Sequence, residues 1–265
     1  MRHRIAASLA LFGLLLMAGC AADGAGPPPG AATTGGFDSP EAALAAYLEG
    51  MRDGDLDAML ATFGSAATVE HYNYVAALQR ARFFTMNQTA PLPDTDSLAR
   101  ELNTALHRGQ VAQFALLQRL YLADPLLMPG SATMFADDDE AATFAETLAA
   151  DLEAIDLSTI KILGFVAPGD ITEHFGSAAN QDLIDRMATV HGAAEMAAVV
   201  AVFTVNGETH LLLADAAELA GRWYLTAFGG NLGMLVGIGM LQQGIIALAD
   251  LPDLGLLAAM TPWGE

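Results

Sequence analysis

The sequence predicts an α+β domain in which helices come first and an antiparallel sheet follows. Two observations lead to this prediction. Apolar residues recur at i, i+3, i+4 and i+7 through much of the N-terminal half, which is the spacing of one helix face. Between residues 197 and 228, the run AAVVAVFTV is rich in β-branched and aromatic residues, and the runs ETHLLLADAAEL and RWYLTAF follow it after the turns Asn206-Gly207 and Ala220-Gly221. Short β runs joined by two-residue turns predict an antiparallel meander.

Composition limits the classes of protein that this chain can belong to. Hydrophobic residues make up 53% of the 265 residues and charged residues 16%, which excludes a disordered or collagen-like chain. The formal net charge is −20, because 11 Lys+Arg face 31 Asp+Glu. Such a surface repels phosphate backbones, so no nucleic-acid partner is expected. Cys20 is the single cysteine, which excludes a disulfide within the chain.

Residues 1–19 have the layout of a bacterial signal peptide. Arg2 and Arg4 precede an apolar stretch that is too short to span a bilayer comfortably. The sequence Met17-Ala18-Gly19-Cys20 resembles the lipobox of bacterial lipoproteins, with Met17 where that family prefers leucine. The resemblance implies cleavage before Cys20 and diacylation of its sulfur. The alternative is an ordinary secretory signal with its cleavage site elsewhere, which leaves a free thiol at position 20.

Residues 20–38 would follow as the lipidated cysteine and a tether. The segment is rich in glycine around Pro27-Pro28-Pro29, a composition typical of a spacer that is part flexible and part extended. Two or more acyl chains anchor a protein stably, so the expected partner of this end is the membrane. The residue after the cysteine is Ala21 and not an aspartate, which resembles lipoproteins of the outer membrane. We therefore expect a lipid-anchored protein of the cell envelope, facing the periplasm if the host has two membranes.

The folded domain is expected over residues 39–228, and its first element is a helix starting at Ser39-Pro40-Glu41. Serine caps a helix, proline suits its first turn, and the acid favours the helix dipole. Gly54 ends this helix and Asp55 begins a second one. The apolar stripes of the two helices are Leu44, Tyr47, Leu48 and Met51 in the first, and Leu56, Met59, Leu60 and Phe63 in the second.

The middle of the chain is mostly helical in pattern. Residues 64–90 are less regular, although a helix is favoured from Tyr72 to Phe84. Further helices are predicted over 96–123, 137–155 and 177–192, and a strand over 159–166. The apolar members of the helix at 96–123 are Leu98, Leu102, Leu106, Phe114, Leu117, Leu120 and Tyr121.

The C-terminal segment, residues 229–265, is apolar and rich in glycine. No charged residue occurs from Trp223 to Ala249. The favoured interpretation is a glycine-broken apolar helix that covers the sheet or the mouth of a pocket. A helix lying against lipid and a membrane span are the alternatives. Gln242-Gln243 and the lack of a basic flank argue against a span.

Two stretches resemble the NTF2-like, cone-shaped α+β superfamily. They are SPEAALAAYLEGMRDGDLDAMLATF at the start of the domain and VVAVFTVNGETHLLLADAAELAGRWYLTAF near its end. The resemblance implies an N-terminal helix hairpin and a C-terminal curved antiparallel sheet. A standard member is shorter, so residues 70–155 are expected to be a mostly helical insertion.

No strong catalytic motif is present, and the candidate site residues come from the resemblance. Cone-fold enzymes place a His, Asp or Tyr in an apolar pocket as an acid, a base or an oxyanion donor. The residues that match this requirement are His71, Tyr72, Tyr74, His210 and Asp215. His210 and Asp215 are five residues apart on one predicted strand, which places them on opposite faces.

No metal and no cofactor are expected. The histidines of the domain show no i, i+3 or i+4 pair that would bind zinc on one helix face. The acidic run at residues 137–140 lacks the alternating acids and the glycine of an EF-hand loop, and it is interpreted as a helix N-terminus.

The function expected from these observations is that of a non-catalytic, membrane-anchored module that binds an apolar ligand or an envelope protein. The alternative is a cone-fold isomerase, dehydratase or cyclase that acts on a small hydrophobic substrate. The second function requires an ionisable side chain deep in a cavity.

Overall fold

The computed structural model describes residues 35–82, 93, 95–123, 133–235, 243–251 and 255–264. Gly35–Glu265 form one compact unit. The predicted signal peptide, Cys20 and most of the tether lie outside the described residues. Within the described ranges, no helix has the length and apolar character needed to cross a membrane.

The first two helices form as predicted. Helix α1 (Pro40–Asp53) begins at Ser39, whose Oγ accepts the Ala42 N–H at 3.1 Å. Helix α2 (Leu56–Ala61) begins at Asp55, whose carboxylate accepts the Ala58 N–H at 2.9 Å. Caps of this kind satisfy backbone donors that a helix leaves free at its start.

The next segment contains the helix predicted within Tyr72 to Phe84, which is α4 (Tyr74–Ala81). A further short helix, α3 (Ser65–His71), was not predicted, and it precedes α4 with a break at Tyr72-Asn73. The break occurs because the Asn73 side chain accepts the Ala76 N–H at 3.0 Å and so begins a new helix. Phe84 lies outside the described residues.

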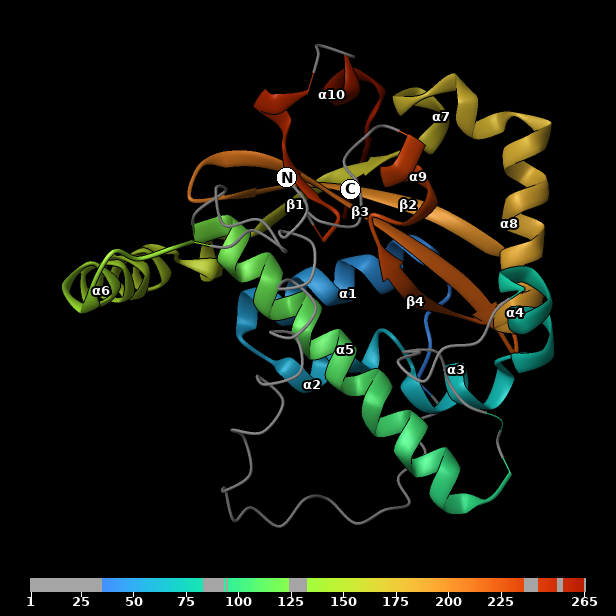
Figure 1. Cartoon of the computed structure of the whole chain (residues 1–265). Coiled ribbons are helices and arrows are strands. Elements are labelled where there is room, and N and C mark those ends of the chain that lie inside the picture. The colour runs from blue at the N-terminus through green and yellow to red at the C-terminus, as the bar shows by residue number, and fades with distance from the viewer. Residues whose placement is uncertain are drawn as a thin grey trace, which may run out of the picture. The chain divides into compact units, whose positions relative to one another are not determined.

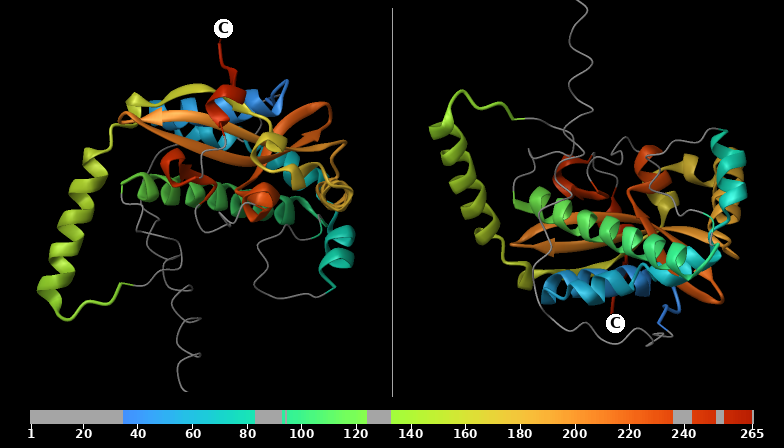
Figure 2. Two further views of the ribbon diagram at one scale, coloured as in Figure 1. Left: turned by 90° about the horizontal axis from the view of Figure 1, so that it is seen from above. Right: turned by 60° about the horizontal axis from the view of Figure 1, so that its bottom comes forward.

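Two longer helices follow, as the apolar spacing predicted. Helix α5 (Ser97–Ala123) runs across the front of α1 and α2 in Figure 1. Helix α6 (Asp138–Ala154) has no buried residue and stands apart from the sheet in both views of Figure 2. The carboxylate of Asp137 caps α6, accepting the Glu140 N–H at 2.9 Å.

The apolar stripe predicted for α5 is only partly buried, since Tyr121 lies in the core and Phe114 packs against it. Four leucines of α5 are more than half exposed: Leu98, Leu102, Leu106 and Leu116. The buried residues of α5 are Asn103, Val111, Gln118 and Tyr121, and of these only Tyr121 belongs to the predicted stripe. A polar side chain can face inward here because a buried partner forms a hydrogen bond with it. Gln118 accepts the hydroxyl of the buried Tyr47 at 2.7 Å.

The sheet has the predicted meander at its centre. It consists of β2 (Met196–Val205), β3 (Glu208–Leu219) and β4 (Arg222–Phe228), all antiparallel. Strand β1 (Lys161–Val166) pairs with β2 on the other side. Asn206 and Gly207 both have positive φ, which is the geometry of the tight hairpin turn that this pair favours.

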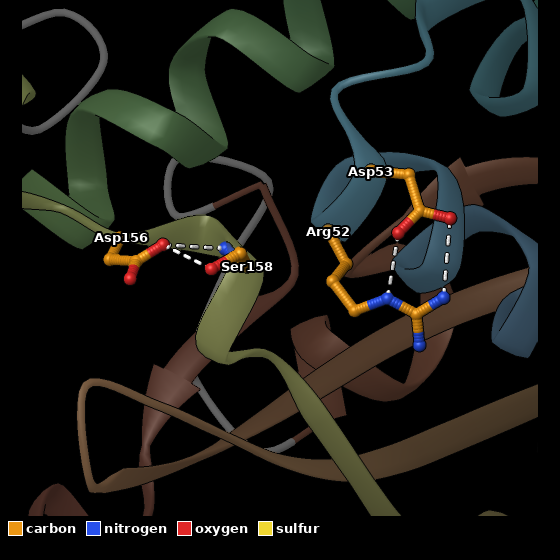
Figure 3. A network of polar contacts seen from close by, with 4 residues as sticks. All are labelled: Arg52, Asp53, Asp156 and Ser158. Carbon is orange, nitrogen blue, oxygen red and sulfur yellow. Dashed lines mark hydrogen bonds and ion pairs between the residues drawn. The ribbon is translucent and has the colours of Figure 1, made fainter.

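Short helical elements connect β1 to β2. They are α7 (Pro168–Ile171), the 3-10 turn η3 (Glu173–Gly176) and α8 (Ala178–His191). Another 3-10 turn, η2 (Leu157–Thr159), precedes β1. Figure 3 shows how Asp156 opens η2 by accepting the Ser158 backbone N–H at 3.0 Å and its hydroxyl at 2.5 Å. The same view shows Arg52 binding the adjacent Asp53 at the end of α1, at 2.8 Å.

The C-terminal segment is not a single apolar helix. It begins with α9 (Gly230–Leu235), and residues 236–242 lie outside the described ones. Strand β5 (Ile245–Ala247) then pairs with β3, and β6 (Thr261–Pro262) pairs with β1. The turn η5 (Leu248–Asp250) and helix α10 (Leu256–Ala259) lie between them. Strand β4 pairs only with Ala214–Leu219 of β3, which leaves the edge of the first part of β3 free to accept the backbone of β5 at His210–Leu212.

The two faces of the sheet carry separate clusters of apolar residues. The larger cluster joins α1, α2 and α5 to one face, and its centre is aromatic, with Tyr47, Phe63 and Phe228 in ring contact. The second cluster covers the other face with residues of α7, α9 and α10. Candidate sites therefore belong either to the face of the helix hairpin or to the face of α9.

Candidate functional site

A cavity of about 240 Å³ lies over the second face of the sheet. Its floor is formed by Asp215 of β3, which pairs in register with Ala198 of β2 and with Ala227 of β4. Because alanine is small, the two neighbours leave open space on both sides of the aspartate. The hollow is therefore a product of the sequence on three adjacent strands.

The walls of the cavity are apolar and come mostly from elements outside the sheet. Helix α8, the turn η3 and helix α9 each contribute to them. The apolar side chains of the walls and rim are Phe175, Leu183, Ile184, Met187, Met196 and Met234. Three of these are methionines, whose flexible side chains adapt to ligands of different shape.

Asp215 is the buried ionisable group of this cavity. Its exposed fraction is 9%, and burial raises the pKa of its carboxyl from 3.8 to about 6. The backbone N–H of Asn231 opposes this shift, donating to Oδ2 over 3.3 Å. A carboxyl with a pKa in this range changes its charge within the physiological pH range.

Helix α9 approaches the aspartate closely at Gly230. A Cβ atom added to Gly230 would lie 2.1 Å from Asp215 Oδ2, so no larger residue fits there without movement. The adjacent Asn231 places its amide away from the carboxylate. It donates to Asn180 Oδ1 at 2.5 Å, and Asn180 in turn donates to the Phe175 carbonyl at 2.8 Å. This chain of hydrogen bonds ties α9 to α8 and η3 around the cavity.

His210 does not share this site with Asp215. Its ring stacks on Phe203 with centroids 5.6 Å apart, and Phe203 belongs to the cluster on the face of the helix hairpin. Burial lowers the pKa of His210, and the backbone and charge of Glu208 oppose that shift. The two residues thus lie on opposite faces, as their odd separation predicted.

His71, Tyr72 and Tyr74 do not line the cavity. Tyr72 contacts the ring of His191 edge to face, with centroids 6.1 Å apart. Burial raises the pKa of Tyr72, which the charge of Arg80 opposes. Of the predicted candidates, only Asp215 is among the residues that form the cavity.

A second group of buried polar residues lies near α3. Ser65 is within 2.9 Å of His107 Nδ1, and burial lowers the pKa values of both His107 and His191 to about 4. Both rings are therefore neutral near pH 7, and Ser65 is 7% exposed. Such burial is typical of a core contact and leaves little access for a substrate.

The described residues contain no cluster of three or more His, Cys, Asp or Glu side chains able to bind a metal ion. The acidic run at 137–140 provides the cap and the first turn of α6. No cofactor-binding arrangement is apparent among the residues that line the cavity.

Comparisons with known proteins add little to this geometry. No protein-family model and no curated protein matches the sequence. One similar solved structure is that of a cystatin-like protein from Ruminococcus gnavus, with a TM-score of 0.39 and 13% sequence identity. The alignment covers 69% of this chain but only 38% of that protein. A similarity this low carries no argument about function.

Sequence reasoning missed the residues that shape the cavity around Asp215. Asn180 and Asn231 come from segments that lie 51 residues apart in the chain. A local signal was nevertheless present, because Asp215 is the single acid within the apolar run Leu211–Ala217. A lone acid on a buried strand indicates either a buried hydrogen bond or a site.

Proposed function

We propose that this protein is a membrane-anchored envelope lipoprotein whose folded domain binds a small apolar ligand in the cavity above Asp215. The observation that carries the proposal is the contrast between the two faces of the sheet. Aromatic rings fill the face of the helix hairpin, while the face of α9 holds a hollow lined by apolar side chains. Apolar cavities with few polar groups are the usual form of small-molecule sites.

The anchor and the fold family belong to the same proposal. The lipobox-like Met17-Ala18-Gly19-Cys20 supports attachment through lipid on Cys20, and the flexible segment that follows supports a domain held off the membrane. The α1–α2 hairpin and the antiparallel sheet support an NTF2-like core. In this proposal, residues 70–155 form a mostly helical insertion into that core.

Native mass spectrometry of the full chain, extracted from membranes in mild detergent, tests ligand binding. We expect an additional mass that disappears on denaturation. The variant Ala198→Leu fills the floor of the cavity and should carry much less of that mass. Ala61→Leu adds the same atoms at an exposed position of α2 and serves as the control.

The two possible failures of this experiment have different meanings. A wild-type chain without additional mass argues against a resident ligand and favours an envelope protein as the partner. A mass that both variants retain equally places the ligand outside this cavity.

One observation favours the alternative of a cone-fold isomerase, dehydratase or cyclase. Asp215 is a carboxyl in an apolar cavity with a pKa raised to about 6, and general bases are commonly tuned in this way. If the bound molecule is identified, its exchange of C–H hydrogens in deuterated water tests this function. Catalysed exchange that stops in Asp215→Asn would support an enzyme, whereas binding without exchange would support the binding module.

A further inference from the structure

The cavity contains a carboxylate whose hydrogen bonding is incomplete. Asp215 Oδ2 accepts the Asn231 backbone N–H, and no contact within the described part of the chain engages Oδ1. The Asn231 amide is directed to Asn180 instead. A carboxylate has about four acceptor positions. Oδ1 is not among the described buried atoms that lack a partner, and Asp215 lines the cavity, so this oxygen is accessible from the cavity. Asp215 therefore has room for a hydrogen-bond donor that the described residues do not supply.

The described residues around the cavity provide no cation that pairs with Asp215. Arg80, which is exposed, is the other ionisable residue of the lining. The lining residues from η3, α8, α9, β2 and β4 carry no charge. No ion pair joins Asp215 to a cation of the described chain, and an isolated buried carboxylate is costly.

We propose that the cavity takes a small apolar amine. Its ammonium group donates to Asp215 Oδ1, and its hydrocarbon body contacts Met187, Met196 and Met234. This proposal rests on the proposed function, because it names the class of ligand for the same cavity. An alcohol and an ammonium can both donate to the ionised carboxylate, but only the ammonium adds the Coulomb attraction of an opposite charge, which favours an amine over an alcohol. A carboxylate ligand would be repelled.

The size of the cavity limits the ligand. Its volume of about 240 Å³ is below the roughly 300 Å³ at which typical small-molecule pockets begin. A single ring or short branched chain with one polar arm suits this space, and a long acyl chain does not.

Calorimetric titration of the full chain in phospholipid nanodiscs tests the proposal, with empty nanodiscs subtracting the partition of each probe into lipid. The probes are cyclohexylmethylamine, cyclohexylmethanol and cyclohexanecarboxylate, which share one ring. At pH 7.5 we expect the amine to bind at least about tenfold more tightly than the alcohol, and the carboxylate most weakly. Because Asp215 ionises between about pH 5 and pH 7, affinity for the amine should rise over that range.

Variants distinguish the contribution of the Asp215 carboxylate to binding from that of the space in the cavity. Asp215→Asn should reduce the preference for the amine to below about threefold while the alcohol still binds. Ala198→Leu should weaken both probes, and Arg80→Gln should leave the preference in place. Retained alcohol binding by Asp215→Asn also shows that this variant is folded.

Each result decides the matter. Equal affinity for amine and alcohol, or a preference that survives in Asp215→Asn, would overturn the amine proposal and leave the cavity as a site for apolar molecules. If the wild-type chain binds none of the three probes, the amine proposal and the proposed ligand site both fail.

Discussion

The raised pKa of the buried Asp215 carboxyl makes the stability of the fold depend on pH. Its apolar neighbours favour the neutral acid, so the carboxyl keeps its proton in the folded chain up to about pH 6, while the unfolded chain releases it near pH 3.8. The folded state therefore binds more protons between these values. The stability contributed by this group is present below about pH 3.8 and is lost as the pH rises through about 6.

Replacing Asp215 by asparagine should remove this dependence on pH. We expect the free energy of unfolding of Asp215→Asn, relative to wild type, to rise by about 1–3 kcal/mol between about pH 4 and about pH 7. Urea unfolding at a series of pH values measures the difference. Asp185→Asn, at an exposed position of α8, is the matched control and should show no comparable trend. A constant difference across the series would mean that Asp215 titrates normally.

Helix α5 shows that an element can be fastened by polar groups on its buried face. Gln118 is fully buried, and it contacts two distant parts of the chain. Its Oε1 accepts the Tyr47 hydroxyl, and its Nε2 donates to the Gln243 carbonyl at 2.9 Å. One side chain thus connects α5 both to α1 and to the turn before β5.

Gln118→Met should leave the Tyr47 hydroxyl and the Gln243 carbonyl without this partner. We expect a loss of about 1–3 kcal/mol in the free energy of unfolding, because buried polar groups without partners are costly. Gln113→Met makes the same change on the exposed side of α5 and should be nearly neutral. In the double variant Tyr47→Phe/Gln118→Met, the cost should be smaller than the sum of the single changes. Strict additivity would show that the hydrogen bond contributes nothing.

On the scale of the whole molecule, the C-terminal segment closes onto the centre of the sheet. The Leu213 N–H donates to the Gly244 carbonyl, and the Gly229 N–H donates to the Leu213 carbonyl, both at 2.8 Å. Gly244 has a φ of +77°, and a Cβ atom there would lie 2.3 Å from the Leu213 oxygen. Backbone from Gly229, at the start of the segment, and from Gly244, in its middle, meets at Leu213 of β3, with no space for a side chain at Gly244.

Gly244→Ala should therefore disrupt the backbone contact between Gly244 and Leu213 of β3. Gly207→Ala is the matched control, since Gly207 has a similar φ of +83° but open space around its Cβ position. Both variants carry the strain of a positive φ, about 1–2 kcal/mol, and Gly244→Ala should lose at least about 2 kcal/mol more. Denaturant unfolding measures both. Equal losses would show that β3 can move to accept the methyl group.

Much of the local structure could be predicted from the sequence. Ser39, Asp55 and the pair Asn206-Gly207 act through neighbours within a few residues, so their caps and turn were predicted correctly. Strands β5 and β6 were not predicted, because their pairing depends on where β3 and β1 lie in space. The burial of Gln118 on α5 was not predicted for the same reason, since its partners lie 71 and 125 residues away.

The candidate site was only partly predictable. The sequence indicated Asp215 and its separation from His210 by the alternation of a strand. It could not show which face of the sheet is hollow, because that depends on Ala198 and Ala227 lying beside Asp215 in register.

The entry of the chain into the folded unit has a mechanical consequence. Phe37 and Trp223 exchange two backbone hydrogen bonds, of 3.1 and 2.9 Å, at the edge strand β4. The Arg222 guanidinium also donates hydrogen bonds to the Asp38 carboxylate and to the Gly36 carbonyl, on either side of Phe37. Tension applied to the chain before residue 35 therefore loads this short ladder before it reaches α1. Force on the N-terminal segment is therefore borne first by the edge strand β4.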